Sequence, residues 1–195
     1  MPPLPPGETS LITLHLHGTL PAATAQGLRT ALGATRAAGL CHHRARKQVF
    51  GHFDAALDEM PAGPRHFERE ELAATLAGEL ALLEEQGFVV HGFAILPNHA
   101  HVVLHLPAHT GLSFAKALDQ LHLRTEAACR RLVRPALPPE TKFWQPGWHE
   151  VPLADTAELT RALAYLQAHA TRVRLPDRFQ AWPYCADSSE RATGS

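Results

Sequence analysis

Hydrophobic and polar residues alternate along the chain in patterns that predict β-strands. Residues 10–17, in the stretch SLITLHLHG, place aliphatic side chains on one face of an extended strand and polar side chains on the other. Residues 88–96 (FVVHGFAIL) and 99–106 (HAHVVLHL) are runs of strand length, and the Pro97-Asn98 pair between them favours a turn. We therefore expect an antiparallel hairpin in the same sheet as the first strand.

Apolar residues recur at helical spacing in the segments between and after these strands. The predicted helices cover residues 19–40, 47–60, 68–87, 112–134 and 155–174. Asp155 is a suitable N-cap for the last helix, and a short strand is expected near 148–153. Together these elements predict an α+β fold, with an antiparallel sheet of about four strands flanked by helices.

Length and composition limit the class of protein. A chain of 195 residues that is 45% hydrophobic suits one globular domain. We place the domain at residues 10–186, between a flexible Pro-rich N-terminus (1–9) and a flexible polar tail (187–195). The apolar runs are too short for a membrane span and the first residues do not resemble a signal peptide, so a cytoplasmic location is expected.

Charge and cysteine content narrow the candidate functions. The formal net charge is −1, so nucleic-acid binding through bulk positive charge is not indicated, and any such contact must use local basic patches. The three cysteines are widely spaced and include no CxxC pair. A thiolate zinc site is therefore not indicated either.

The second strand of the hairpin carries three histidines on one face. His99, His101 and His105 share this face because strand side chains alternate. His99 and His101 lie at the mouth of the hairpin, where a third side chain could complete a divalent metal site that leaves positions open for a phosphate. His105 lies about 13 Å along the strand from His101, so we do not expect it to bind the metal.

The last predicted helix places a tyrosine and a histidine together. Tyr165 and His169 are four residues apart and lie on one stripe of the helix. On its own, this pair also fits simple packing with a hydrogen bond. Because a strand with two histidines is also predicted, the tyrosine and histidine pair also fits a role in chemistry at a metal site.

Several segments together resemble one family. GFAILPNHAHVVLHLP is similar to the strand-turn-strand signature of the single-tyrosine transposases of the HUH endonuclease superfamily, named for a His-hydrophobic-His motif. ITLHLHGTLP resembles the first strand of that family, KFWQPGWHEVPLADTAEL its Trp-Gln loop, and ALAYLQAHATRVRL the helix that bears its nucleophilic tyrosine. The long helical insert after the first strand most resembles the REP-associated tyrosine transposases.

The resemblance implies a ferredoxin-like HUH endonuclease fold and a metal-dependent single-stranded DNA endonuclease and transposase. It assigns the nucleophile to Tyr165 and two metal ligands to His99 and His101, with Mg²⁺ or Mn²⁺ as the cofactor. The partner it implies is single-stranded DNA with hairpin or palindromic elements, bound by a monomer or homodimer. Cleavage and rejoining would proceed through a 5′-phosphotyrosine.

Two features depart from the family pattern. His169 stands where the family has Asn or Gln; histidine also binds metals, so we assign it as the third ligand, which would favour transition metals. The other departure is a less basic chain. Arg124, Arg130 and Arg131 are the candidate DNA-phosphate contacts, although cations near a helix C-terminus also suit the helix dipole.

Two alternatives remain open. One is a domesticated protein that binds a DNA hairpin without cutting it. The other is a nucleotide hydrolase with a site like that of the histidine-triad proteins, although the spacing of His105 does not suit it.

Overall fold

The strands of this chain form one antiparallel sheet in a computed structural model that describes residues 4–37, 42–59, 63–110 and 113–187. Within the described residues the sheet has five strands. Their order from edge to edge is β4 (His149–Pro152), β1 (Gly7–His15), β3 (His99–Pro107), β2 (Val89–Ile95) and β5 (Cys185–Asp187). The predicted α+β fold with an antiparallel sheet is confirmed, with one more strand than expected.

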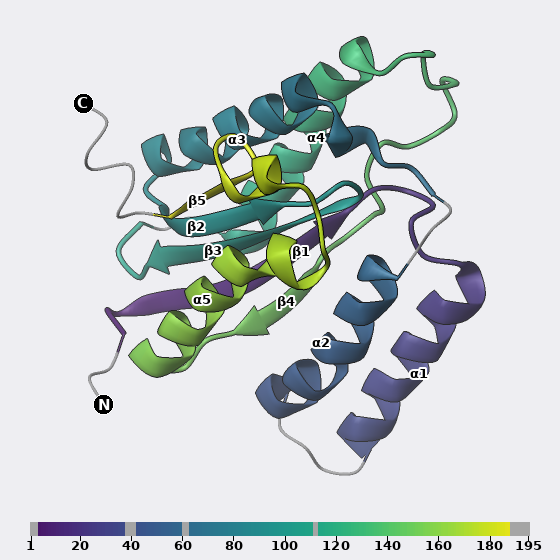
Figure 1. Cartoon of the computed structure of the whole chain (residues 1–195). Coiled ribbons are helices and arrows are strands. Elements are labelled where there is room, and N and C mark those ends of the chain that lie inside the picture. Colours follow the sequence, from purple (N-terminus) through teal and green to yellow (C-terminus); the bar gives the residue numbers. More distant parts are fainter. Residues whose placement is uncertain (1–3, 38–41, 60–62, 111–112, 188–195) are drawn as a thin grey trace.

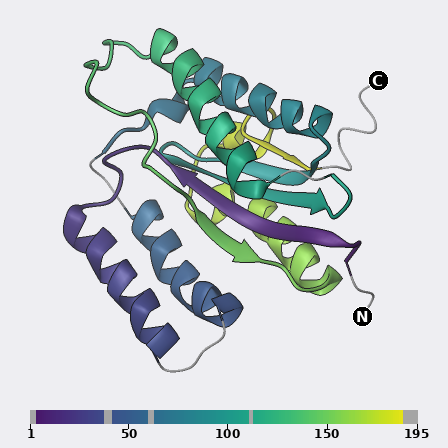
Figure 2. The same ribbon diagram turned by 180° about the vertical axis from the view of Figure 1, so that it is seen from behind.

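Helices cover both faces of this sheet (Figures 1 and 2). The α-helices are α1 (Ala22–Ala37), α2 (His42–Asp58), α3 (Glu70–Glu85), α4 (Phe114–Leu132) and α5 (Thr156–Arg172). Helices α3 and α4 lie side by side on one face, and α5 lies on the other. Helices α1 and α2 form a pair beside the β4 edge, apart from α3 and α4.

The alternation of side chains along β1 and β3 divides the core in two. Ile12 and Leu14 point into the larger cluster under α3 and α4, whereas Leu11 and Val103 belong to the smaller cluster under α5. The register pairs Thr13 with His101 and His15 with His99. The histidines of β3 therefore lie on the face of the sheet that α5 covers.

The element boundaries differ from the sequence predictions at the ends of the chain. Strand β1 begins at Gly7, so residues 7–9 belong to the sheet and not to a flexible N-terminal segment. Asp187, placed in the flexible tail, ends strand β5. The remaining tail residues, 188–195, lie outside the described residues, as do 1–3.

The helices match their predictions more closely. Asp155 caps α5 as expected, because its carboxylate accepts a hydrogen bond of 2.8 Å from the Glu158 backbone N–H. Helix α2 begins earlier than predicted, at His42. None of the described helices is long and apolar enough to cross a membrane.

Candidate metal centre and tyrosine site

Two histidines of β3 are held in fixed orientations by hydrogen bonds to one of their ring nitrogens. His99 and His101 are buried, with exposures of 1% and 0%. The Asn98 amide donates to the Leu57 carbonyl at 2.9 Å, so its oxygen accepts from Nδ1 of His99 at 2.7 Å. Nδ1 of His101 is 2.9 Å from the Thr13 hydroxyl. This is the arrangement that orients imidazoles for metal binding through Nε2.

Two further side chains complete a compact cluster with these histidines. His169 comes from α5 and Asp54 from α2, and both are buried. The ligand atoms of the four residues all lie within 4.8 Å of one another. The structure thus brings together all three predicted metal ligands and adds a carboxylate.

Each of the four side chains keeps one buried atom without a hydrogen bond among the described residues: Asp54 Oδ1, His99 Nε2, His101 Nε2 and His169 Nδ1. Asp54 Oδ1 and His101 Nε2 are 3.0 Å apart. Four orphaned polar atoms in one buried cluster require an explanation, because buried polar groups are normally paired. The donor set of three imidazoles and one carboxylate fits a divalent cation, more closely a transition metal than Mg²⁺.

The electrostatics of the cluster favour the protonation states that bind metal. Burial, followed by the charges of the neighbouring histidines, lowers the pKa of His99 well below its usual value. Burial also lowers the pKa of His101. For Asp54, burial opposes ionisation, but the imidazole of His101, 3.0 Å away, prevails and holds the pKa of the carboxyl below its usual range. His99 and His101 are therefore neutral and the Asp54 carboxylate is ionised near neutral pH.

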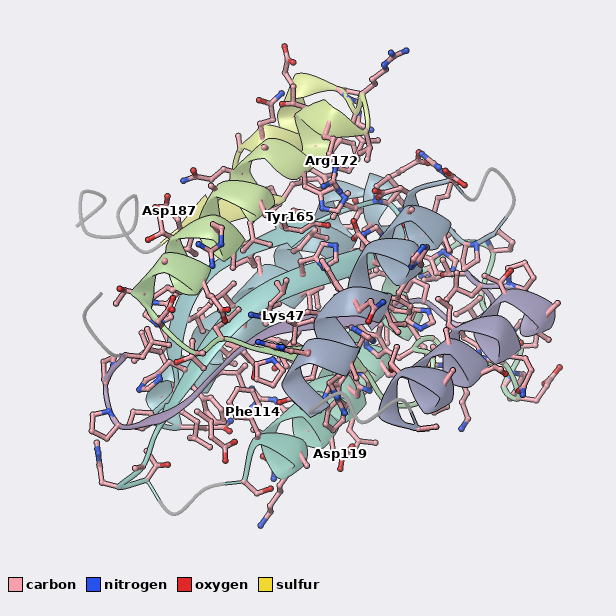
Figure 3. All side chains as sticks on the ribbon, turned by 90° about the horizontal axis from the view of Figure 1, so that it is seen from below. Lys47, Phe114, Asp119, Tyr165, Arg172 and Asp187 are labelled. Carbon is pink, nitrogen blue, oxygen red and sulfur yellow. The ribbon has the colours of Figure 1, made fainter. Side chains whose placement is uncertain are left out.

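The tyrosine predicted as the nucleophile lies next to this cluster. The ring of Tyr165 is 4.9 Å from that of His169 and 5.5 Å from that of His101, measured between centroids. Its hydroxyl accepts a hydrogen bond of 3.2 Å from Arg172, which also donates to Asp54. Figure 3 shows Tyr165 and Arg172 close together on α5.

Arg172 connects the tyrosine to the acidic side chains of α2. Its guanidinium group lies 4.6 Å above the centre of the Tyr165 ring and 2.9 Å from Oδ2 of Asp54. It is also 3.3 Å from Oδ2 of Asp58, whose other oxygen is 2.9 Å from Nε2 of His169. Burial and the Asp54 carboxylate raise the pKa of Tyr165, while the hydrogen bond from Arg172 acts in the opposite direction.

The arginines predicted to contact DNA lie on α4, on the other side of the sheet. Arg124 Nε is 2.8 Å from a carboxylate oxygen of Glu79 on α3. Arg130 donates to the backbone carbonyls of Thr141 and Pro138, the latter at 2.8 Å. Arg130 thus anchors the loop after α4, and Arg131 is exposed. The structure does not bring these three arginines to the metal cluster, and DNA contact by them stays a prediction.

Asp54 and Arg172 are the candidate site residues that the sequence analysis missed. Asp54 is four residues after Phe50 and three before Leu57, on the face of α2 that packs inward. A carboxylate on such a face was the available signal. His105 stays outside the cluster as expected, with its Nδ1 2.8 Å from the hydroxyl of Thr9.

Comparisons with known proteins show a structural likeness. No protein-family model matches the sequence, and no curated protein matches it. A solved structure described as a REP-associated tyrosine transposase bound to a REP hairpin is similar in fold, with a TM-score of 0.51 and 15% sequence identity. The match covers 97% of this chain and 82% of that one. This chain therefore has the fold of a REP-associated tyrosine transposase.

Proposed function

We propose that this chain is a divalent-metal-dependent single-stranded DNA endonuclease and strand transferase that forms a covalent 5′-phosphotyrosine at Tyr165. The observation that carries the proposal is a tyrosine packed against a buried candidate metal cluster, with Arg172 donating to both its hydroxyl and the cluster carboxylate of Asp54. The neighbour of the same fold is named as a tyrosine transposase bound to a DNA hairpin, which supports hairpin DNA as the partner.

The ligands of the cation would be His99, His101, His169 and Asp54. When bound there, a divalent cation such as Mn²⁺ or Mg²⁺ would offset the charge that develops on the scissile phosphate and help to align that phosphate. Thr13 and Asn98 hydrogen-bond to Nδ1 of His101 and His99, respectively. Nε2 of each ring is therefore the nitrogen available to bind the cation. The strand thus contributes a rigid half of the site, and the two helices contribute the other half.

The tyrosine supplies the nucleophile. The Tyr165 oxygen attacks the phosphorus, the bond from phosphorus to the 3′ oxygen of the upstream nucleotide breaks, and that oxygen takes up a proton. The phenolic proton must leave as the new bond forms, and Asp54, which shares Arg172 with the phenol oxygen, is its proposed acceptor. Arg172 donates to the same hydroxyl and stabilises negative charge that develops on it. Attack of a 3′ hydroxyl on the phosphotyrosine would reverse these steps and rejoin a strand.

The arginines of α4 have a separate proposed role. Arg131 and Arg124 would contact phosphates of a bound hairpin on the face of the protein that α4 covers, adding affinity without reading sequence. The ion pair of Arg124 with Glu79 reduces the share that Arg124 contributes. Arg130, committed to the loop carbonyls, would contribute least.

Cleavage of a single-stranded hairpin oligonucleotide tests the function. Two versions of the oligonucleotide are used, one labelled at its 5′ end and one at its 3′ end. Each is incubated with the protein and Mn²⁺ or Mg²⁺. We expect the 3′-labelled fragment to remain on the protein after denaturation, and chelation of the metal to abolish this product. His99→Ala and His101→Ala should each prevent the reaction, whereas His105→Ala, which alters a histidine of the same strand outside the cluster, should retain it. A product that forms equally in excess chelator would contradict the proposal.

A further inference from the structure

A cavity of about 480 Å³ opens beside the metal cluster, between the α1–α2 helix pair and the loop that leads into β4. Phe53, the neighbour of Asp54 along α2, forms part of its wall. So does His15, the β1 residue paired in register with His99. The cavity and the cluster thus share the same stretches of α2 and β1, although no cluster residue lines the cavity. Its volume is in the range of small-ligand sites.

The walls of the cavity present flat rings. The rings of Phe53 and His149 stack at 4.7 Å with an interplanar angle of 22°, and His15 meets Phe53 edge-on at 5.7 Å. Trp148 also lines the cavity, and Leu28 and Ala25 of α1 contribute apolar side chains. Because Phe53 and His149 stack on each other, the ring available to stack with a planar ligand is the Trp148 indole.

The same walls offer hydrogen-bonding groups but no lysine, arginine, aspartate or glutamate among the described residues that line them. His15 is nine-tenths buried, and its Nδ1 has no partner among the described residues. Nε2 of His149 is likewise buried and without a partner there. The side chain of Gln145 adds an amide. A ligand that satisfies these groups is flat and uncharged, and it carries donors and acceptors on its edge.

We propose that this cavity binds one unpaired nucleobase of the DNA strand, next to the scissile phosphate, and so selects the position of cleavage. The inference rests on the proposed function and names part of its substrate. A nucleobase combines a stackable face with a hydrogen-bonding edge, which matches the rings and the orphaned imidazole nitrogens. The phosphate attached to it would remain outside these uncharged walls, on the side of the metal cluster. A base within a duplex is stacked and paired, so the site requires single-stranded DNA.

Binding of the four free deoxynucleosides tests the cavity directly. The full chain, labelled with ¹⁵N in its histidine rings, is titrated with each deoxynucleoside and, separately, with deoxyribose 5-phosphate. We expect at least one deoxynucleoside to shift the ring signals of His15 and His149 in a saturable manner, and the sugar phosphate to leave them unchanged. The inference is overturned if no deoxynucleoside moves these signals, or if the sugar phosphate moves them equally.

Three variants locate the binding. Trp148→Ala removes a stacking surface, and Ala25→Phe fills the cavity from α1 without touching the loop; both should weaken deoxynucleoside binding about tenfold or more. Trp182→Ala is the matched control, because Trp182 is 60% exposed and does not line the cavity; its binding should stay within about twofold of the parent. Ala25→Phe keeps the test valid if Trp148→Ala unfolds. Parent-like binding by a folded Ala25→Phe protein overturns the inference.

An abasic scan of a hairpin oligonucleotide relates the cavity to cleavage. Binding is measured with the Tyr165→Phe protein, so that no strand is cut. Removal of one base adjacent to the cleavage position should lower the affinity of the Tyr165→Phe protein for the oligonucleotide about tenfold. In a protein that also carries Ala25→Phe, removal of the same base should have little further effect on that affinity. Multiplicative losses overturn the inference. Deoxynucleoside binding needs neither metal nor Tyr165, so a protein that binds deoxynucleosides but forms no covalent product would refute the nuclease function alone.

Discussion

Replacing Thr13 with valine removes one hydroxyl from the support of the metal cluster and leaves the ligands themselves in place. Thr13 is fully buried, and its hydroxyl lies 2.9 Å from Nδ1 of His101. In Thr13→Val this nitrogen loses its partner, so the imidazole ring can rotate and change tautomer. Loss of such an outer partner lowers metal affinity about 10- to 100-fold. The unpaired buried nitrogen should also cost about 1–3 kcal/mol of unfolding free energy.

The chain contains a matched control for this change. Thr9 and His105 form the same pair at the other end of the same two strands, 2.8 Å apart and also in register. Thr9→Val should lose a comparable unfolding free energy but no metal affinity, because His105 lies outside the cluster. If metal affinity fell only because the protein became less stable, both variants would lose the same amount of metal affinity.

Calorimetric titration of Mn²⁺ into the full chain measures the affinity, and urea unfolding without metal measures the stability. The account requires Thr13→Val to weaken Mn²⁺ binding about tenfold or more while Thr9→Val binds as the parent does. Equal Mn²⁺ affinity in the two variants would refute the argument that Thr13 orients a metal ligand.

Three further predictions address the carboxylate, the pH dependence and the arginines. Asp54→Asn should weaken Mn²⁺ binding more than about tenfold in the same titration, and parent-like affinity would remove Asp54 from the ligand set. Burial lowers the pKa of His15 and His149 to about 4, whereas the unfolded chain takes up these protons near pH 6.5. Stability is therefore complete above about pH 6.5 and falls below it, by about 2 kcal/mol per histidine at about pH 5; urea unfolding that does not change over this range would contradict the burial argument. Arg131→Ala should reduce the slope of log affinity for single-stranded DNA against log salt by about 0.7, whereas Arg130→Ala should mainly lower the melting temperature, and the reverse pattern would assign Arg130 to the DNA.

Local patterns in the sequence predict much of the fold. The alternation over residues 99–106 placed His99 and His101 on one face, because side chains on a strand alternate whatever surrounds it. The N-cap at Asp155 also depends only on neighbouring residues. Strand β5 was not predicted because its three residues are too few to show an alternating pattern. Its position is set by pairing with β2.

The candidate site depended on contacts between distant segments, and spacing alone could not supply them. That Tyr165 and His169 face the histidine strand was implied by the family resemblance and not by the pattern of α5. Asp54 reaches the cluster because α2 packs beside β4 and α5, through ionic contacts such as that of Lys47 with Glu158. The spacing of Asp54 in α2 indicates an inward position, but it does not indicate which residues the carboxylate meets. The role of Arg130 could not be predicted for the same reason, because the carbonyls that it binds lie in a loop without regular structure.

The most direct test of the nuclease proposal is the identity of the residue that carries the DNA. The parent chain, Tyr165→Phe and Tyr184→Phe are each incubated with a hairpin oligonucleotide and Mn²⁺, denatured, digested and mapped by mass spectrometry. Tyr184 is the control because it is buried in the core, where its hydroxyl lies 3.3 Å from the Glu68 carbonyl. The account predicts a nucleotide on the peptide that contains Tyr165 in the parent and in Tyr184→Phe, and none in Tyr165→Phe. A covalent product that persists in folded Tyr165→Phe protein would contradict it.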